Sequence, residues 1–196
     1  MDKFSLKYLA KFICEYDIKS ISINGSIDRP MPIEAIQYNR LVNLDLQGTG
    51  LHSEDLFILS QVLKDNISIT SINLSRNMIG MRYIDPSKMQ EIQASQSDKL
   101  SQNMLYDSLG LEHFTLAFKS TDRIQALDIS ENNLGVKNFL ILLPIFRSNI
   151  FIEELNVAET KIDGECAEKM CSILKSSNKS LKVLKFRNSN IQDDGA

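Results

Sequence analysis

Few side chains in this sequence have the types and spacing that catalysis or metal binding requires. His52 and His113 fall in expected helical segments and show no spacing typical of a nucleophile with its base. Cys14, Cys166 and Cys171 form no C-x-x-C pair, and no H-E-x-x-H motif is present. The eight glycines are scattered and form no phosphate-binding loop. We therefore expect a protein that is not an enzyme and that holds no cofactor and no metal ion.

Charged and amide side chains, in contrast, recur at regular intervals and have the chemistry to bind a protein partner. An acidic group extends from Asp128 to Glu159, and a small basic group follows at Lys185 and Arg187. Such charges can steer a partner of complementary charge. The predicted partner-binding residues are Asp45, Asn73, Asp128, Glu131, Glu154, Asn156, Glu159, Lys185 and Arg187. The alternative is a solvated surface whose charges are incidental.

These residues are spaced by an internal repeat. From Leu41, apolar residues stand at relative positions 1, 4, 6 and 11, with a small polar residue at position 9. The pattern recurs from residues 69, 124, 152 and 181, so the starts are separated by 28, 55, 28 and 29 residues. A weaker copy begins near residue 18. Apolar residues two apart predict a strand, and the spacing that follows predicts a helix, in every unit.

The doubled interval of 55 residues has two explanations. The segment from Leu100 to Leu105 echoes the segment from Leu74 to Ile79, which favours an eroded repeat that starts near residue 95. The alternative is a surface loop inserted over residues 80–108. With the eroded repeat, the array holds about seven units, of which the last is incomplete.

The repeated residues resemble the leucine-rich repeat, whose strand signature is L-x-x-L-x-L-x-x-N/C-x-L. The period resembles the ribonuclease-inhibitor-like, intracellular class. The resemblance implies an α/β solenoid, or horseshoe, with a parallel β-sheet on the concave face and helices on the convex face. At the polar repeat position, Asn77, Asn103 and Asn132 can satisfy backbone groups inside the turn, and the family has an asparagine ladder there. The predicted binding residues then belong to the concave face or its rim.

The two ends of the chain lie outside the regular pattern. Residues 1–17 predict an N-terminal capping helix, and the array extends over residues 18–196. The residues expected to cover the first repeat are Phe4, Tyr8, Phe12, Ile13 and Tyr16. A partner-binding amphipathic helix is the alternative. At the other end the last unit lacks its helix, which predicts a fragment of a longer array or an open edge through which the chain self-associates.

Composition excludes several classes of protein. The 22 basic and 25 acidic residues give a net charge of −3, which argues against nucleic-acid binding. No apolar run approaches the ~20 residues of a membrane span, and the N-terminus lacks the long apolar core of a signal peptide. Three unpaired cysteines favour a reducing compartment. We expect a cytoplasmic protein, or one acting in host cytosol if it is a secreted effector.

The predicted function is protein–protein interaction without catalysis. Within the resemblance, the chain fits a scaffold or a translocated bacterial effector with a protein partner of unknown identity. One alternative is a regulatory GTPase-activating protein on the same scaffold, although no residue matches the rim motif that this activity needs. Another alternative is the substrate-recognition part of a larger enzyme such as a ubiquitin ligase.

Overall fold

The computed structural model describes residues 3–25, 27–84 and 107–187. Its helices are α1 (Lys3–Glu15), α2 (Ile33–Gln37), α3 (Ser53–Leu63), α6 (Leu109–Ser120), α7 (Gly135–Ser148) and α8 (Gly164–Ser177). Its strands are β1 (Asn43–Asp45), β2 (Ser71–Asn73), β3 (Ala126–Asp128), β4 (Glu154–Asn156) and β5 (Val183–Lys185). Each strand begins two residues after one of the repeat starts at 41, 69, 124, 152 and 181.

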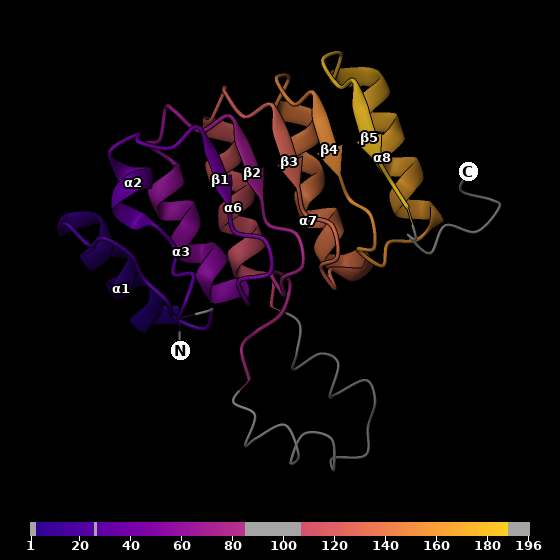
Figure 1. Ribbon diagram of the computed structural model, residues 1–196. Helices are drawn as coiled ribbons and strands as arrows, with labels where there is room; N and C mark the ends of the chain where they lie inside the picture. Colours follow the sequence, from indigo (N-terminus) through magenta and orange to yellow (C-terminus); the bar gives the residue numbers. More distant parts are fainter. Residues whose placement is uncertain (1–2, 26, 85–106, 188–196) are drawn as a thin grey trace, which may run out of the picture.

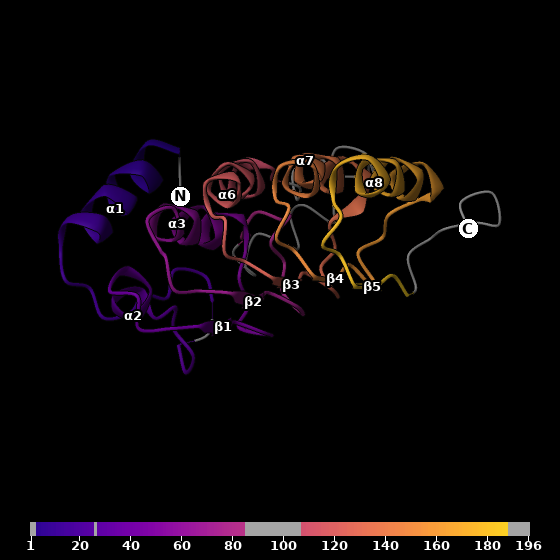
Figure 2. The same ribbon diagram turned by 90° about the horizontal axis from the view of Figure 1, so that it is seen from above.

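The five strands form one parallel sheet in chain order, from β1 to β5. Figures 1 and 2 show the strands side by side in one layer, with α3, α6, α7 and α8 in a second layer on one side of them. A right-handed strand–helix–strand crossover places the helices on one face in this way. The predicted α/β solenoid with a parallel sheet is therefore confirmed.

The central residue of each strand points toward the helices. Leu44, Ile72, Leu127 and Leu155 are aligned by the strand register and are 1–2% exposed. Leu184, the equivalent residue of β5, is 39% exposed. The sheet is thus fully covered over its first four strands and is more open to solvent at β5.

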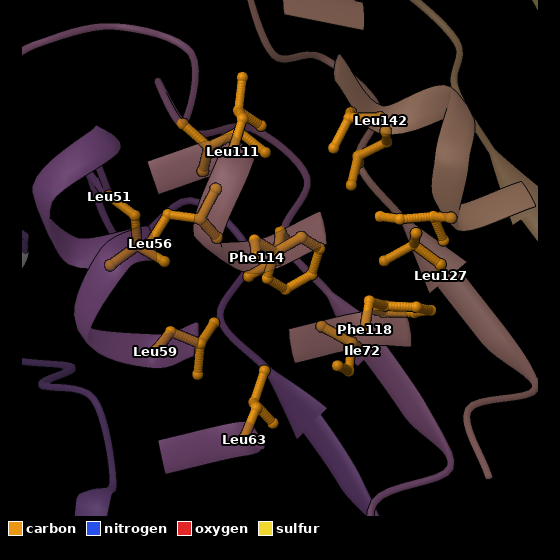
Figure 3. Packing of buried hydrophobic residues seen from close by; sticks show 14 of the residues in the cluster. Leu51, Leu56, Leu59, Leu63, Ile72, Leu111, Phe114, Phe118, Leu127 and Leu142 are labelled. Carbon is orange, nitrogen blue, oxygen red and sulfur yellow. The ribbon is translucent and has the colours of Figure 1, made fainter. Parts of the chain in front are cut away.

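The core lies between the sheet and the helix layer. Figure 3 shows Phe114 of α6 among leucines of α3, with Leu127 of β3 and Leu142 of α7 on its other side. Phe114 and Phe118 are 1% exposed. Burying each such side chain contributes ~2 kcal/mol, so neighbouring units stabilise one another through shared aromatic and leucine contacts.

The long interval between residues 69 and 124 has a simple arrangement in the sheet. β2 pairs directly with β3, with Ile72 opposite Leu127. The next helix after α3 in the layer is α6, and the two helices approach closely at Gly110, whose N–H donates to Ser53 Oγ at 2.9 Å. A Cβ on Gly110 would lie 2.1 Å from the Ser53 carbonyl oxygen, so this contact requires glycine.

This pairing bears on the expected repeat near residue 95. That start lies outside the described residues. β2 and α6 together supply the strand and helix of one unit, which is the arrangement that an insertion between a strand and its helix produces. The count of about seven units stays a prediction.

The weak copy near residue 18 adds no strand to the described sheet. Ile21 instead forms an isolated antiparallel bridge with Met31, and the two residues exchange hydrogen bonds of 3.0 and 2.8 Å. The helix that follows, α2, has five residues. The 23 residues available before the start at 41 are too few for a strand and a full helix.

The predicted N-terminal helix forms as α1, but its inner face differs from the expected one. Leu6, Ala10 and Ile13 are the buried residues. The expected covering residues Phe4, Tyr8, Phe12 and Tyr16 are exposed; that part of the prediction was wrong, and only Ile13 was placed correctly. Small and aliphatic side chains allow the helix to lie closer to its neighbours than large rings do, which explains the choice of face. Among the described residues, no helix has the length and apolar character needed to cross a bilayer.

Candidate partner-binding face

The face of the sheet that points away from the helices, here called the sheet face, presents two columns of side chains. The strand register aligns the first column as Asn43, Ser71, Ala126, Glu154 and Val183. It aligns the second column as Asp45, Asn73, Asp128, Asn156 and Lys185. Both columns line a shallow hollow of about 210 Å³ over β2 to β5.

Four of the predicted binding residues in the second column also hold the turn that follows their strand. In each, the Oδ1 atom accepts a hydrogen bond from the backbone N–H two residues later. These bonds are Gln47 to Asp45 at 3.0 Å, Ser75 to Asn73 at 3.0 Å, Ser130 to Asp128 at 2.9 Å and Ala158 to Asn156 at 3.2 Å. An Asx turn of this kind satisfies a backbone donor at the strand end. The second column is therefore partly structural.

Asp128 is the most strongly held member of this column. Its Oδ1 also accepts from the Ser130 hydroxyl at 2.6 Å, and its Oδ2 accepts from Asn156 Nδ2 at 2.8 Å. The structure thus brings two predicted site residues, Asp128 and Asn156, into direct contact. Asp45 lies far from them on β1, where its Oδ2 is 3.9 Å from Arg29 Nη2.

A ridge follows the end of the strands, where the chain turns away from the sheet face. Gly48, Arg76, Glu131 and Glu159 occupy the same repeat position, and all four have a left-handed backbone with φ between 53° and 61°. The shared conformation places these residues side by side, and Arg76 Nε donates to Glu131 Oε1 at 2.9 Å. Glu131, and Glu159 more weakly, raise the pKa of the Arg76 guanidinium. The ridge therefore carries paired charge, which weakens the predicted acidic cluster.

Besides Glu159 on the ridge, three of the predicted residues keep an exposed charge at the C-terminal half of the sheet. Glu154 lies in the first column on β4, and Lys185 lies in the second column on β5. Arg187 follows β5, and its carbonyl oxygen accepts from the Glu159 N–H at 2.9 Å. Glu154 and Lys185 both line the hollow with the half-buried Asp128, so it has two acidic and one basic side chain together with the apolar Ala126 and Val183.

The predicted asparagine ladder is present at the described positions. Asn132 Nδ2 donates to the carbonyl oxygens of Leu74, Ile129 and Ser130, and its Oδ1 accepts from the Ile79 N–H. Asn77 makes the same set of bonds one strand earlier. Thr49 and Thr160 each donate to the carbonyl three residues before, within their own turn. Asn103 lies outside the described residues.

A second polar ladder, which the sequence analysis missed, lies where each helix returns to the next strand. Asn178 is 7% exposed, donates to the Asn149 carbonyl at 3.1 Å and accepts from the Ser180 and Leu181 N–H groups at 3.0 Å. Asn149 and Asn66 make equivalent bonds. The signal was available, because Asn66, Asn149 and Asn178 each stand three residues before a repeat start.

Buried titratable groups elsewhere have structural roles. Burial raises the pKa of Asp55, which caps the start of α3 by accepting from the His52 N–H at 3.0 Å. Burial, followed by a hydrogen bond with Asp163, raises the pKa of the Cys166 thiol to about 11, so it is protonated at neutral pH. In the part of the chain that the structure describes, no three His, Cys, Asp or Glu residues are grouped to hold a metal ion.

Comparisons with known proteins agree with this architecture. The profile of the family described as Leucine Rich repeat matches residues 177–196. No curated protein matches the chain in sequence. Among solved structures, the chain is similar to one titled leiomodin-1 actin-binding site 2, with 16% identity and a TM-score of 0.59 over 79% of this chain and 76% of that one. The period, the strand register and the family match identify the chain as a protein with the leucine-rich repeat fold.

Proposed function

We propose that this chain is a protein–protein interaction module without catalytic activity and that it binds its partner through the sheet face. The observation that supports this proposal is the hollow over β2 to β5, which is lined by polar, charged and apolar side chains from four successive strands. Solenoids use such extended faces to bind other proteins. The ridge, at Glu131 and Glu159, is the second part of the proposed binding surface.

The charges suggest how a partner is recognised. Glu154 and Lys185 are on neighbouring strands, and Val183 between them is 37% exposed. Glu154 lies between Ala126 and Val183 in the first column. A partner that fits therefore carries a basic group for Glu154, apolar groups for its two neighbours, and an acidic group for Lys185. Such complementary charge contributes more to specificity and association rate than to affinity. The absence of aromatic residues from both described columns argues for moderate affinity.

Actin is the first partner to test, because the similar solved structure is titled an actin-binding site. The likeness is one of fold, so it guides the choice of the first assay. The scaffold and translocated-effector roles, and the cytoplasm or host cytosol as location, are proposed with it. The three cysteines, which are free thiols, support a reducing compartment. The GTPase-activating and ubiquitin-ligase alternatives stay predictions from the resemblance.

The experiment is a binding assay with purified chain and actin, followed by affinity capture of other partners if actin does not bind. Glu154→Lys and Lys185→Glu reverse the exposed charges at the hollow and leave the Asx turns intact. Glu168→Lys is the matched control, because Glu168 is an exposed carboxylate on α8 in the helix layer. We expect the first two variants to weaken partner binding about tenfold or more and the control to bind like the wild type. Equal binding by all three would contradict the use of this face.

A further inference from the structure

α1 and Tyr16, which directly follows it and whose N–H donates to the Phe12 carbonyl, expose a row of large aromatic side chains on the face that points away from the core. Phe4, Tyr8, Phe12 and Tyr16 recur every fourth residue and are 77, 74, 47 and 57% exposed. Residues four apart lie above one another on a helix, so the four rings form one stripe, here called the aromatic stripe. The Phe12 and Tyr16 rings stack with centroids 4.4 Å apart. An apolar patch of this kind on a folded protein marks an interaction surface.

Basic side chains accompany the aromatic stripe. α1 contains three lysines and one acidic residue, Glu15. Lys7 and Lys11 are exposed and, by helical spacing, lie on the outer face beside the rings. Lys11 Nζ is 3.7 Å from Glu15 Oε1, whereas Lys7 makes no ion pair among the described residues. The outer face of the first three turns is therefore aromatic and cationic.

The place of α1 in the fold leaves this face accessible. Figures 1 and 2 show α1 as the outermost helix at the N-terminal end of the solenoid. Its buried residues, Leu6, Ala10 and Ile13, face the protein, so the opposite face points outward. From Phe4 to Tyr16 the stripe is about 18 Å long.

We propose that the outer face of α1 docks on an anionic lipid membrane. The amphipathic Tyr rings lie in the headgroup region, the apolar Phe rings reach its boundary with the acyl chains, and Lys7 and Lys11 lie against the lipid phosphates. The helix lies in the interface plane and does not cross the bilayer. This surface is separate from the sheet face, so the chain can hold a protein partner while it is docked.

The shape of the stripe favours a membrane over a protein partner. Four partly exposed rings offer on the order of 500 Å², which is less than the ~800 Å² that each partner buries in a standard protein interface. Headgroups, in contrast, accept single rings without a matching pocket, and their phosphates complement the charge of the lysines.

Vesicle co-sedimentation of the full chain tests the proposal. One vesicle contains phosphatidylcholine alone, and the other contains about 30% phosphatidylserine. We expect binding to the anionic vesicle that falls as salt is raised. Tyr8→Ser combined with Phe12→Ser, and separately Lys7→Gln combined with Lys11→Gln, should each lower partitioning about tenfold. The four side chains are exposed, so unchanged thermal unfolding is expected for both variants.

A matched control distinguishes membrane binding through the aromatic stripe from nonspecific binding through any exposed apolar side chain. Leu116 and Ile150 are 60% and 54% exposed and lie outside α1, so Leu116→Ser combined with Ile150→Ser should bind vesicles like the wild type. Equal loss in this control, equal binding to both vesicles, or binding to neither would overturn the proposal. The proposal also fails if the chain does not bind vesicles and instead forms a dimer that the Tyr8→Ser, Phe12→Ser double variant abolishes. The aromatic stripe would then bind a second copy of the chain.

Discussion

The turn interiors and the first column of the sheet face follow opposite rules along the same repeats. Inside the strand-end turns, Thr49, Asn77, Asn132 and Thr160 all carry a hydrogen-bonding hydroxyl or amide, and each donates to the carbonyl three residues before it. In the first column, Asn43, Ser71, Ala126, Glu154 and Val183 change from polar to apolar to charged. A position that satisfies the backbone needs a hydrogen-bonding side chain in every unit, whereas a position that faces solvent does not.

The second column of the sheet face is intermediate between the turn interiors and the first column in how uniform its residues are. Asp45, Asn73, Asp128 and Asn156 all hold an Asx turn, and the series ends at Lys185, which cannot accept a hydrogen bond. Similar chemistry along a column therefore indicates a structural role, and a break in it indicates freedom for binding. Substitutions in the three kinds of position should destabilise the fold to decreasing extents.

The largest effect is expected at the turn interior, for Asn132→Ala. The substitution removes the hydrogen bonds of Asn132 to the Ile79 N–H and the Ile129 carbonyl in a buried site. The Leu74 carbonyl, in contrast, keeps its bond from Asn77. Unsatisfied buried groups cost 1–3 kcal/mol each, so we expect the free energy of unfolding to fall by about 3 kcal/mol in urea denaturation. Asn133→Ala is the control, since Asn133 Oδ1 is buried without a partner, and it should cost less than about 0.5 kcal/mol. Equal losses of stability in the two variants would mean that the turn-interior residue stabilises the fold no more than its neighbour does.

The next effect is expected at the second ladder, for Asn178→Ala. Asn178 makes three hydrogen bonds with backbone groups that join α8 to the next unit. We expect a loss of about 2 kcal/mol, since the site is nearer the open end of the sheet than Asn132 and water can replace part of the bonding. Lys179→Ala, at the adjacent exposed position, should be near neutral. Calorimetric unfolding of both variants measures the difference, and a neutral Asn178→Ala would mean that these bonds are not needed.

The period, the strand positions and the ladder could be predicted from the sequence because they depend on local spacing. Two apolar residues two apart predict a strand at each of the starts 41, 69, 124, 152 and 181, and these five strands form where expected. The weak copy near residue 18 forms only an isolated bridge. The Arg76–Glu131 pair could not be predicted, because the residues are 55 apart and meet only through the direct pairing of β2 with β3.

The repeat pattern also did not predict the orientation of α1 or the structural roles of the second column. α1 has apolar residues on two faces, and spacing alone favoured the larger rings, with Ile13, over Leu6 and Ala10. Packing distance, which is a tertiary property, decided between them. For Asp128, the sequence indicated charge at the right column but not that its oxygens are used within the fold.

A smaller effect is expected in the second column, for Asp128→Ala. The variant loses acceptors for the Ser130 N–H and for Asn156 Nδ2 at a half-buried position, where water can replace them in part. We expect a loss of about 1 kcal/mol in urea denaturation. Asp128→Asn keeps one oxygen acceptor and should recover at least half of the loss. If Asp128→Asn is as unstable as Asp128→Ala, charge and not the Asx turn accounts for the effect.

The smallest effect is expected in the first column. Ser71 and Glu154 line the hollow on β2 and β4, and their side chains make no hydrogen bond to a backbone group within the described part of the chain. Ser71→Ala and Glu154→Ala should each change the free energy of unfolding by less than about 0.5 kcal/mol. Urea denaturation of the single variants and of the double variant measures this, and the double should equal the sum of the singles because the residues lie two strands apart. A loss above about 1 kcal/mol at either position would mean that the first column also supports the fold, and variation along a column would then no longer identify residues free to bind a partner.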